Sequence, residues 1–186
     1  MLEVFLLLGF LLVLFVSGLT LMNVKVMAAL LVIELFSLPG LWLIFRRSPP
    51  FVPTPQKIMN TMMKLAKVKE GQTVYDLGCG DGRLLIEAAK KGAHAIGYEF
   101  SYPTYLLAWF RTRNMRDAVP RFGNFWKQSY DDADVIFCYL LTHTMKEFQE
   151  KIWPQLKAGT RVVSHCFKMP DIAYAEAENG VYVYVK

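Results

Sequence analysis

The sequence contains little cysteine and no cluster of residues that would ligate a metal ion. Its three cysteines, Cys79, Cys138 and Cys166, are odd in number and widely spaced among 186 residues. No Cys-x-x-Cys pair and no Cys/His cluster is present, which argues against a disulfide framework and a structural zinc site. We therefore expect three buried, unreactive thiols in a reducing compartment, and we predict that the protein binds no metal.

Charged residues are almost absent from the first 45 positions, where only Glu3, Lys25 and Glu34 occur. Residues 4–22 carry no charge, and a helix of this length crosses a hydrocarbon core of about 30 Å. A secretory signal peptide would need a basic segment before the apolar run and a small-residue cleavage site after it. The sequence shows neither clearly, so we predict a transmembrane anchor over residues 1–47.

The predicted anchor has two possible arrangements. A second apolar run follows Lys25 and ends at Arg46 and Arg47. Either residues 23–25 turn a helical hairpin, or a single span is followed by a helix that lies in the membrane interface. We prefer the hairpin, and both arrangements remain open. In both, the positive-inside tendency places the following domain in the cytoplasm, or in the matrix at the mitochondrial inner membrane if the source is eukaryotic.

The chain beyond the apolar segment is basic. Of 21 basic and 16 acidic residues in the whole sequence, all but Lys25, Glu3 and Glu34 follow position 45. An excess of positive charge suits a domain that lies against an anionic membrane surface. Nucleic acid is a weaker interpretation, because there is no run of Lys or Arg and no basic-aromatic motif. We thus expect a lipid membrane and a membrane protein as partners, and no nucleic acid.

A proline-rich linker precedes the globular domain. Residues 48–53 contain three prolines, which remove backbone donors and favour extended geometry. Thr54 is then the expected N-cap of a helix with Pro55 at its first position, so the domain covers residues 54–186. After this helix, at 55–67, strand and helix patterns alternate. The expected strands are 73–77, 93–98, 118–122, 134–140 and 161–167, and the expected helices are 83–91, 103–114 and 145–156.

This alternation indicates an α/β fold. Alternating units build a doubly wound, parallel sheet of the Rossmann-like type. The last two expected strands, at 172–177 and 181–185, are joined by Asn179 and Gly180, which is a strong signal for a two-residue hairpin. We therefore predict a Rossmann-like, mostly parallel sheet that ends in an antiparallel hairpin and is preceded by a transmembrane helical segment.

The most informative stretch reads DLGCGDGR and ends at Arg83. A strand ends in a carboxylate, and a glycine-rich turn then enters a helix whose free N–H groups favour an anionic part of a ligand. A dinucleotide-binding turn would need its third glycine where this chain has Arg83, whose bulk prevents close helix packing. The turn therefore indicates a cofactor other than a dinucleotide. The candidates to bind it are Asp76, Gly78, Cys79, Gly80 and Asp81.

An acidic residue ends the second expected strand. Glu99 lies about 20 residues beyond the glycine turn, where a carboxylate can accept hydrogen bonds from two ribose hydroxyls. Alone, a strand-end acid says little about function. Together with the glycine turn, Glu99 is a candidate to bind the ribose of a nucleoside cofactor.

Several motifs together resemble a known family. DLGCGDG followed by GYE resembles the first motif and the acidic second-strand motif of class I S-adenosylmethionine-dependent methyltransferases. More narrowly, PFVPTP, DLGCGDGR, GYE, GNFWK, DADVIFCYLL and GTRVVSHCF occur in the order seen in small membrane-anchored protein-lysine methyltransferases. Mitochondrial members of that group modify the ATP-synthase c-subunit and the adenine nucleotide translocase. The resemblance covers about residues 50–168.

The resemblance implies S-adenosylmethionine as the cofactor and a role for each matching residue. Asp76, Gly78 and Gly80 would hold its methionine part, and the acid of the second strand would hold its ribose. Asn124 matches a position that often carries aspartate beside the adenine, so the contact is expected without its charge. Thr54 would close over the methionine end.

Methyl transfer requires a nucleophile with a free lone pair, so a lysine amine, with a reference pKa of about 10.4, must first lose its proton. A desolvating, aromatic-lined channel favours the neutral amine. Tyr139, at the end of the fourth expected strand, is the candidate catalytic residue that lines this channel. Phe125, Trp126 and His143 are weaker candidates, and His165 is expected to be a core residue.

These inferences combine into one hypothesis with two alternatives. We predict a membrane-anchored, S-adenosylmethionine-dependent methyltransferase that modifies lysine on a membrane protein. A methyltransferase for a small membrane-associated molecule, such as a quinone or a lipid, uses the same cofactor site. A non-enzymatic scaffold that binds the cofactor is the third interpretation.

Overall fold

The computed structural model describes Val26 and residues 51–186. The predicted anchor at 1–47, apart from Val26, and the first half of the predicted linker lie outside the described residues. Among the residues that are described, none belongs to a helix that combines the length and the apolar character needed to span a bilayer. The chain from Pro50 to Lys186 forms one unit through its own contacts.

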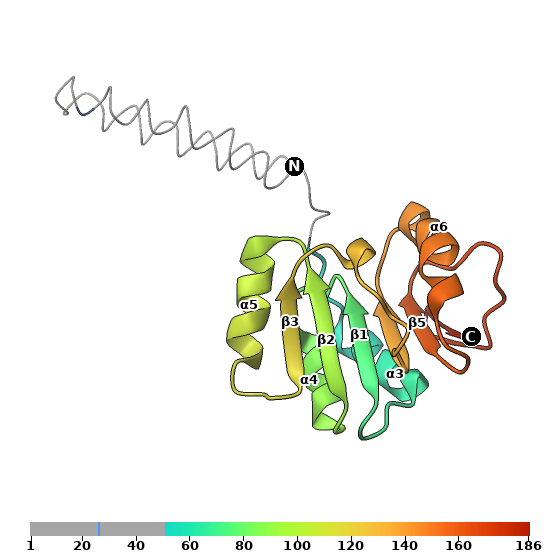
Figure 1. The fold of residues 1–186 in the computed structure, drawn as a ribbon, viewed down its shortest axis with the longest axis horizontal. Coiled ribbons are helices and arrows are strands. Elements are labelled where there is room, and N and C mark those ends of the chain that lie inside the picture. Colours follow the sequence, from blue (N-terminus) through green and yellow to red (C-terminus); the bar gives the residue numbers. More distant parts are fainter. Residues whose placement is uncertain (1–25, 27–50) are drawn as a thin grey trace. The chain divides into compact units, whose positions relative to one another are not determined.

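A seven-stranded sheet is the centre of this unit, in the order β3-β2-β1-β4-β5-β7-β6 (Figure 1). The five strands from β3 to β5 are parallel, and β7 pairs antiparallel with both β5 and β6. The predicted Rossmann-like sheet with antiparallel strands at its carboxyl-terminal end is confirmed. The strands are β1 (Thr73–Leu77), β2 (His94–Glu99), β3 (Ala118–Phe122), β4 (Val135–Cys138), β5 (Arg161–His165), β6 (Glu176–Glu178) and β7 (Val181–Val185).

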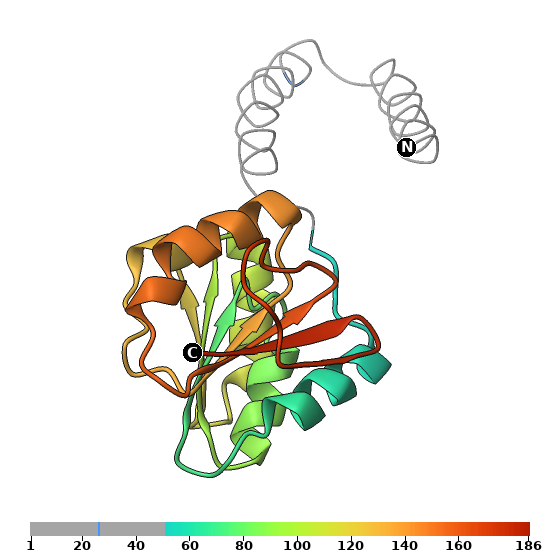
Figure 2. The same cartoon turned by 90° about the vertical axis from the view of Figure 1, so that its right-hand side faces the viewer.

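Helices cover both faces of the sheet. Figure 2 shows α6 on one side of the strands and the α3–α4 pair on the other. Helix α5 packs mainly along the edge strand β3. The helices are α3 (Gln56–Ala66), α4 (Arg83–Lys90), α5 (Tyr102–Thr112) and α6 (Thr142–Lys151), with short 3-10 turns η1 (Phe125–Lys127) and η2 (Trp153–Gln155).

Each face of the sheet carries its own apolar core, because side chains alternate along a strand. On β4, Phe137 faces the core formed with α3 and α4, whereas Ile136 faces the core formed with α6. Met62 and Leu85 are the largest fully buried side chains of α3 and α4, and Phe148 is that of α6. Burial of side chains of this size contributes about 1.5–3 kcal/mol each, which fixes the sheet between its helices.

Several predicted helix and strand boundaries are wrong. Strand β4 ends at Cys138 rather than 140, β5 ends at His165 rather than 167, and α6 begins at Thr142 rather than 145. Helix α3 begins at Gln56, and Pro55 rather than Thr54 is its N-cap. Helix α6 ends at Lys151 rather than near residue 156, because Pro154 removes a backbone donor and the chain forms a 3-10 turn there. Strand β6 covers Glu176–Glu178 only, since the residues before it make few ladder bonds to β7.

The predictions for two individual side chains also need correction. Cys79 and Cys138 are buried as expected, but Cys166 is exposed. It follows the last residue of β5 and has a positive φ of 70°, so the backbone turns away from the sheet and carries the thiol to the surface. His165, expected in the core, is only half-buried because it is the last residue of the same strand.

Candidate functional site

The glycine-rich turn is clamped to the carboxyl end of β2. The N–H groups of Gly78 and Cys79 both donate to the carbonyl oxygen of Tyr98, at 2.9 and 3.1 Å, and Gly82 donates to the carbonyl of Cys79 at 2.9 Å. Gly78, Gly80 and Gly82 all have positive φ, between 55° and 80°, which side chains strongly disfavour. The turn therefore needs glycine for its backbone shape.

Glu99 lies against this turn. Its carboxylate accepts from the N–H of Gly80 at 3.0 Å and from the N–H of Ser101 at 2.7 Å. Burial raises the pKa of Glu99, and the backbone donors partly offset that effect. The structure thus brings the predicted ribose acceptor and the predicted methionine-binding turn into direct contact.

Asp76 is a carboxyl group buried at the end of β1. Burial raises its pKa to about 8, and the negative charges of Glu99 and Asp81 act in the same direction. Desolvation and like charges both disfavour the ionised form of an acid. A cationic group bound beside Asp76 would reverse this effect, so the site suits a ligand that carries positive charge.

Asp81 uses its side chain to hold the turn together. Its carboxylate accepts from Arg83 at 2.8 Å and pairs with Arg111 of α5. Burial alone would raise the pKa of Asp81, but the hydrogen bond from Arg83 and the charge of Arg111 outweigh it and lower the pKa. Arg83 also donates to the carbonyl of Thr54 at 2.6 Å. This network joins the end of the linker, the glycine turn and α5, while direct contacts of Asp81 and Thr54 with a cofactor stay predictions.

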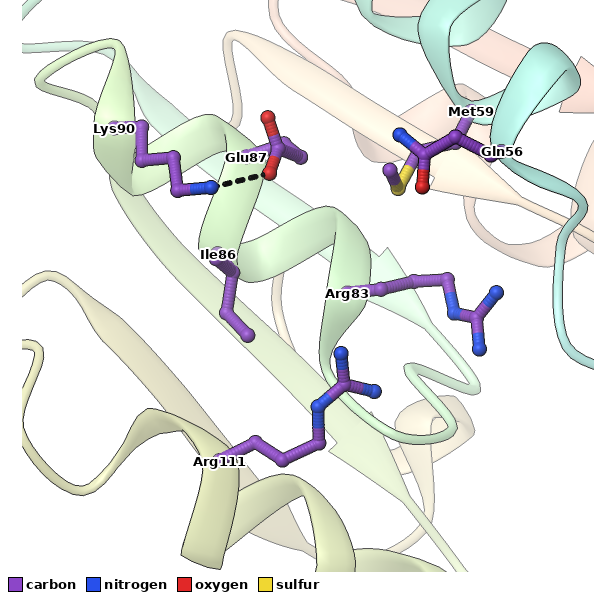
Figure 3. Close-up of a pocket in the computed structure, with 7 residues that line it drawn as sticks. All are labelled: Gln56, Met59, Arg83, Ile86, Glu87, Lys90 and Arg111. Atoms are coloured by element: carbon purple, nitrogen blue, oxygen red, sulfur yellow. Dashed lines mark hydrogen bonds and ion pairs between the residues drawn. The ribbon is translucent and has the colours of Figure 1, made fainter.

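A pocket of about 270 Å³ lies on the outer side of the same network. Figure 3 shows Arg83 and Arg111 at one end of it and Lys90 paired with Glu87 at the other. Side chains from α3, α4 and α5 line it, and none of them is a predicted cofactor-binding residue. The pocket is therefore separate from the glycine turn, on the solvent side of α4.

Asn124 lies close to the end of β2. The N–H of Gly123 donates to the carbonyl of Glu99 at 3.0 Å, which fixes the loop beside the glycine turn. The side-chain oxygen of Asn124 accepts from the N–H of Trp126 at 2.9 Å and caps the turn η1. An amide can make this cap as well as a carboxylate, which accounts for asparagine at this position.

Tyr139 lies one residue beyond β4, next to the glycine turn. Leu77 pairs with Cys138 in the parallel ladder, so the residues that follow them, Gly78 and Tyr139, leave the sheet side by side. The ring of Tyr139 lies 4.6 Å from that of His165, centroid to centroid. The structure thus pairs the candidate channel residue with a histidine that was expected in the core.

The weaker channel candidates lie elsewhere. Phe125 and Trp126 contact each other, with ring centroids 4.7 Å apart, and pack against the core beneath α6. His143 is exposed on the first turn of α6. Among the described aromatic candidates, Tyr139 is the one whose backbone leaves the sheet beside Gly78.

Two residues that shape the site were not predicted from the sequence. A Cβ on Gly97 would lie 2.5 Å from Cβ of Cys79 and 2.8 Å from Cδ1 of Leu85, so β2 needs glycine where the turn crosses it. A glycine inside a strand often marks such a close approach, and this signal was available in the sequence. Phe51 is the second: its ring lies directly over Gly80.

Comparison with known proteins identifies the family. Residues 76–176, more than half of the chain, match the family described as the ANTKMT methyltransferase domain. The chain belongs to this family. A protein-lysine N-methyltransferase of Saccharolobus islandicus is 39% identical over 126 residues, which cover 64% of this chain and 78% of that protein. The human lysine N-methyltransferase of the ATP-synthase c-subunit is 31% identical over 126 residues, which cover 65% of this chain and 53% of that protein.

Solved structures of other methyltransferases resemble this chain. An RNA methyltransferase from Salinibacter ruber, in complex with S-adenosyl-L-homocysteine, is 34% identical with a TM-score of 0.68, over 72% of this chain and 93% of that one. A methyltransferase from Geobacter sulfurreducens with the same ligand has a TM-score of 0.52 at 20% identity, over 67% and 53%, and shows the same fold. The chain is an S-adenosylmethionine-dependent methyltransferase, and its cofactor is the one expected from the sequence.

The residues of the glycine turn fit this cofactor. When bound, S-adenosylmethionine supplies a methyl group that its positively charged sulfur makes electrophilic. Asp76, a buried acid with a raised pKa, suits the cationic methionine end, and Glu99 suits the ribose hydroxyls. The positive φ of Gly80, 55°, accounts for glycine at this position of the turn. These residues would bind and orient the cofactor at the carboxyl edge of the sheet.

The substitution Glu99→Ala should weaken cofactor binding. A charge-assisted hydrogen bond contributes about 1.5–3 kcal/mol, so the dissociation constant for S-adenosylhomocysteine should rise about ten- to a hundredfold. Isothermal titration calorimetry measures this constant, and Glu87→Ala, a half-buried acid of α4 that pairs with Lys90, serves as the matched control. Equal affinity in both variants would show that Glu99 does not hold the ribose.

Proposed function

We propose that the protein is a protein-lysine N-methyltransferase that works at a membrane surface. The observation that carries the proposal is the shared acceptor of its relatives: the archaeal and human proteins are both named lysine N-methyltransferases. Both matches extend over 126 residues, which is most of the described domain. The family resemblance of the sequence motifs also indicated lysine as the methyl acceptor.

The geometry beside the glycine turn supports an amine acceptor. Tyr139 and His165 form an aromatic pair where β4 and β5 end, and Tyr139 directly follows Cys138, which pairs with Leu77 beside the glycine turn. Burial lowers the pKa of His165, which keeps its ring neutral near pH 7. A neutral, aromatic surface lowers the pKa of a lysine amine by desolvation and adds no positive charge that would repel it. In this proposal, Tyr139 and His165 line the lysine channel.

The membrane part of the proposal comes from the sequence. Residues 4–22 are uncharged, and Arg46 and Arg47 follow the second apolar run. An anchor of this kind confines the enzyme to a thin layer and raises the effective concentration of a membrane-bound acceptor. The proposed substrate is therefore a lysine of a membrane protein near the cytoplasmic face, or the matrix face in a mitochondrion.

Transfer of a tritiated methyl group to native membranes tests the proposal. Full-length enzyme and labelled cofactor are added to membranes that lack the enzyme, and the products are separated into protein, lipid and RNA. We expect label in protein that appears as methyl-lysine after acid hydrolysis, and about ten- to a hundredfold less label with Glu99→Ala at limiting cofactor concentration. Label in the lipid extract would instead identify a small membrane-associated acceptor. Label in RNA would instead identify RNA as the methyl acceptor, as the name of the Salinibacter ruber protein states for that protein.

A further inference from the structure

The outer face of α5 is apolar and exposed to solvent. Tyr102, Leu106, Trp109 and Phe110 recur at a spacing of three or four residues, so they lie on one stripe of the helix. All four are exposed, Trp109 by 51% and Phe110 by 57%. A helix of a soluble domain normally turns such a stripe toward the core. Helix α5 has the opposite arrangement.

The buried side of α5 explains why the large residues lie outside. Ala108 and Thr112 are its only buried residues, and they pack on Gly82 at the start of α4. A Cβ on Gly82 would lie 3.3 Å from Cγ2 of Thr112 and 3.4 Å from Cβ of Ala108. This close approach leaves room for small side chains only. The aromatic stripe therefore makes no contribution to the core of the domain.

Neighbouring residues extend the stripe into a continuous surface. Phe122, at the end of β3, is 53% exposed, and its ring contacts those of Tyr102 and Tyr105, with centroids 5.3 and 5.7 Å apart. Phe100, just before α5, is exposed as well. We call this surface the α5 face and define it by Phe100, Tyr102, Leu106, Leu107, Trp109, Phe110 and Phe122. An exposed apolar surface of this kind marks an interaction site.

Arginine surrounds the far end of the α5 face. Arg113 and Arg116 follow the stripe and are exposed, whereas Arg111 pairs with Asp81. Residues 100–116 contain no acidic side chain. The guanidinium of Arg113 lies over the ring of Phe110, 3.8 Å from its centroid. Aromatic and leucine side chains next to arginine are the composition of helices that lie in an anionic membrane interface.

We propose that the α5 face docks on a lipid bilayer with anionic headgroups. The aromatic and leucine side chains enter the headgroup boundary, and Arg113 and Arg116 pair with lipid phosphates. This contact is separate from the anchor predicted at residues 1–47 and requires no particular methyl acceptor.

The position of the α5 face links docking to catalysis. Helix α5 begins just after Glu99, at the carboxyl edge of the sheet (Figure 1). The ring of Phe51 lies over Gly80 of the glycine turn. Docking would therefore hold the cofactor site close to the membrane surface. A lysine of an integral membrane protein would meet the site at that level, and here the inference builds on the proposed function.

A fluorescent label on the α5 face tests this inference in the full-length chain. Cys166→Ser removes the exposed thiol, while Cys79 and Cys138 are buried and do not react. Leu106→Cys then carries an environment-sensitive dye on the face, and His143→Cys carries it on the exposed first turn of α6 as the matched control. Each protein is reconstituted into vesicles of phosphatidylcholine and phosphatidylglycerol, with or without brominated acyl chains.

We expect the dye at position 106 to emit at shorter wavelength in vesicles and to be quenched by brominated lipid, while the dye at 143 responds to neither. Arg113→Glu with Arg116→Glu should reduce the quenching at 106, as should vesicles without the anionic lipid. Since no methyl transfer is needed, these results are independent of the acceptor assay.

Three outcomes would overturn the inference. A dye at 106 with the emission it has in water means that the face stays exposed. A shift to shorter wavelength without quenching means that protein covers it, either residues 1–50 of the same chain or a second copy. Equal quenching at 106 and 143 means that the domain lies near the membrane without turning the α5 face toward it.

Discussion

The substitution Asp76→Asn is expected to stabilise the fold and to weaken cofactor binding at the same time. The carboxyl group of Asp76 is buried, and its pKa is raised to about 8 by desolvation and by the charges of Glu99 and Asp81. Asparagine has nearly the same shape and never ionises. It removes the electrostatic cost of a buried carboxylate, and it also removes the charge that would pair with the cationic end of the cofactor.

The size of the stabilisation by Asp76→Asn depends on pH. Below about pH 4 the acid is protonated in both the folded and the unfolded chain, so the substitution changes little. Between about pH 4 and 8 the folded protein keeps a proton that the unfolded chain has lost, and wild-type stability falls as pH rises. The gain from Asp76→Asn should thus grow up to about pH 8 and then level off. Since one pKa unit corresponds to about 1.4 kcal/mol, we expect at least about 2 kcal/mol at pH 8.5.

Thermal unfolding at several pH values measures this difference, and Asp134→Asn is the matched control. Asp134 precedes β4, accepts from the N–H of Thr73 and pairs with Lys157. Burial would raise its pKa, but Lys157 and the backbone donor lower it, so Asp134→Asn should destabilise the protein at neutral pH. Binding of S-adenosylhomocysteine should weaken about tenfold or more in Asp76→Asn alone. A variant that is less stable than wild type at pH 8.5 would contradict the raised pKa.

The substitution Gly97→Ala should damage both the fold and the site through a single methyl group. The new Cβ would lie 2.5 Å from Cβ of Cys79 and 2.8 Å from Cδ1 of Leu85, two buried atoms with little room to move. Overpacking of this kind costs about 1–3 kcal/mol. Relief requires the glycine turn to move away from β2, which would break the contacts of Gly78 and Cys79 with Tyr98.

We therefore expect a lower unfolding temperature for Gly97→Ala and a weaker affinity for S-adenosylhomocysteine at temperatures where the variant is still folded. Gly123→Ala is the control, because a Cβ there meets no atom within 4 Å and the backbone is not in the left-handed region. Calorimetric unfolding and ligand titration of both variants decide the question. A Gly97→Ala protein with wild-type stability would mean that Cys79 and Leu85 can rearrange without loss.

The three neighbouring acids Asp76, Asp81 and Glu99 have different partners in the structure, and their expected roles therefore differ. Asp81 is neutralised by Arg83 and Arg111, so its charge serves the packing of α4 and α5. Glu99 is stabilised by backbone donors from Gly80 and Ser101. Asp76 has neither kind of partner among the described side chains. Its charge is therefore the one most affected by a cationic ligand.

Much of this architecture followed from the sequence, because the signals were local. The alternation of apolar strands and amphipathic helices predicted the Rossmann-like sheet, and Asn179 with Gly180 predicted the final hairpin. The stretch from Asp76 to Gly82 and the acid at Glu99 indicated a nucleoside cofactor other than a dinucleotide, since backbone shape and charge at a strand end depend on neighbours in the sequence. The family resemblance then implied S-adenosylmethionine.

Only the tertiary structure decided which side chains meet across elements. The pairing of Asp81 with Arg111, the approach of Gly97 to Cys79 and the contact of Tyr139 with His165 each join residues that no local pattern connects. The exposed stripe on α5 is the clearest case. Periodicity alone gives an apolar face and assigns it to the core, whereas the close packing of Ala108 on Gly82 turns that face outward.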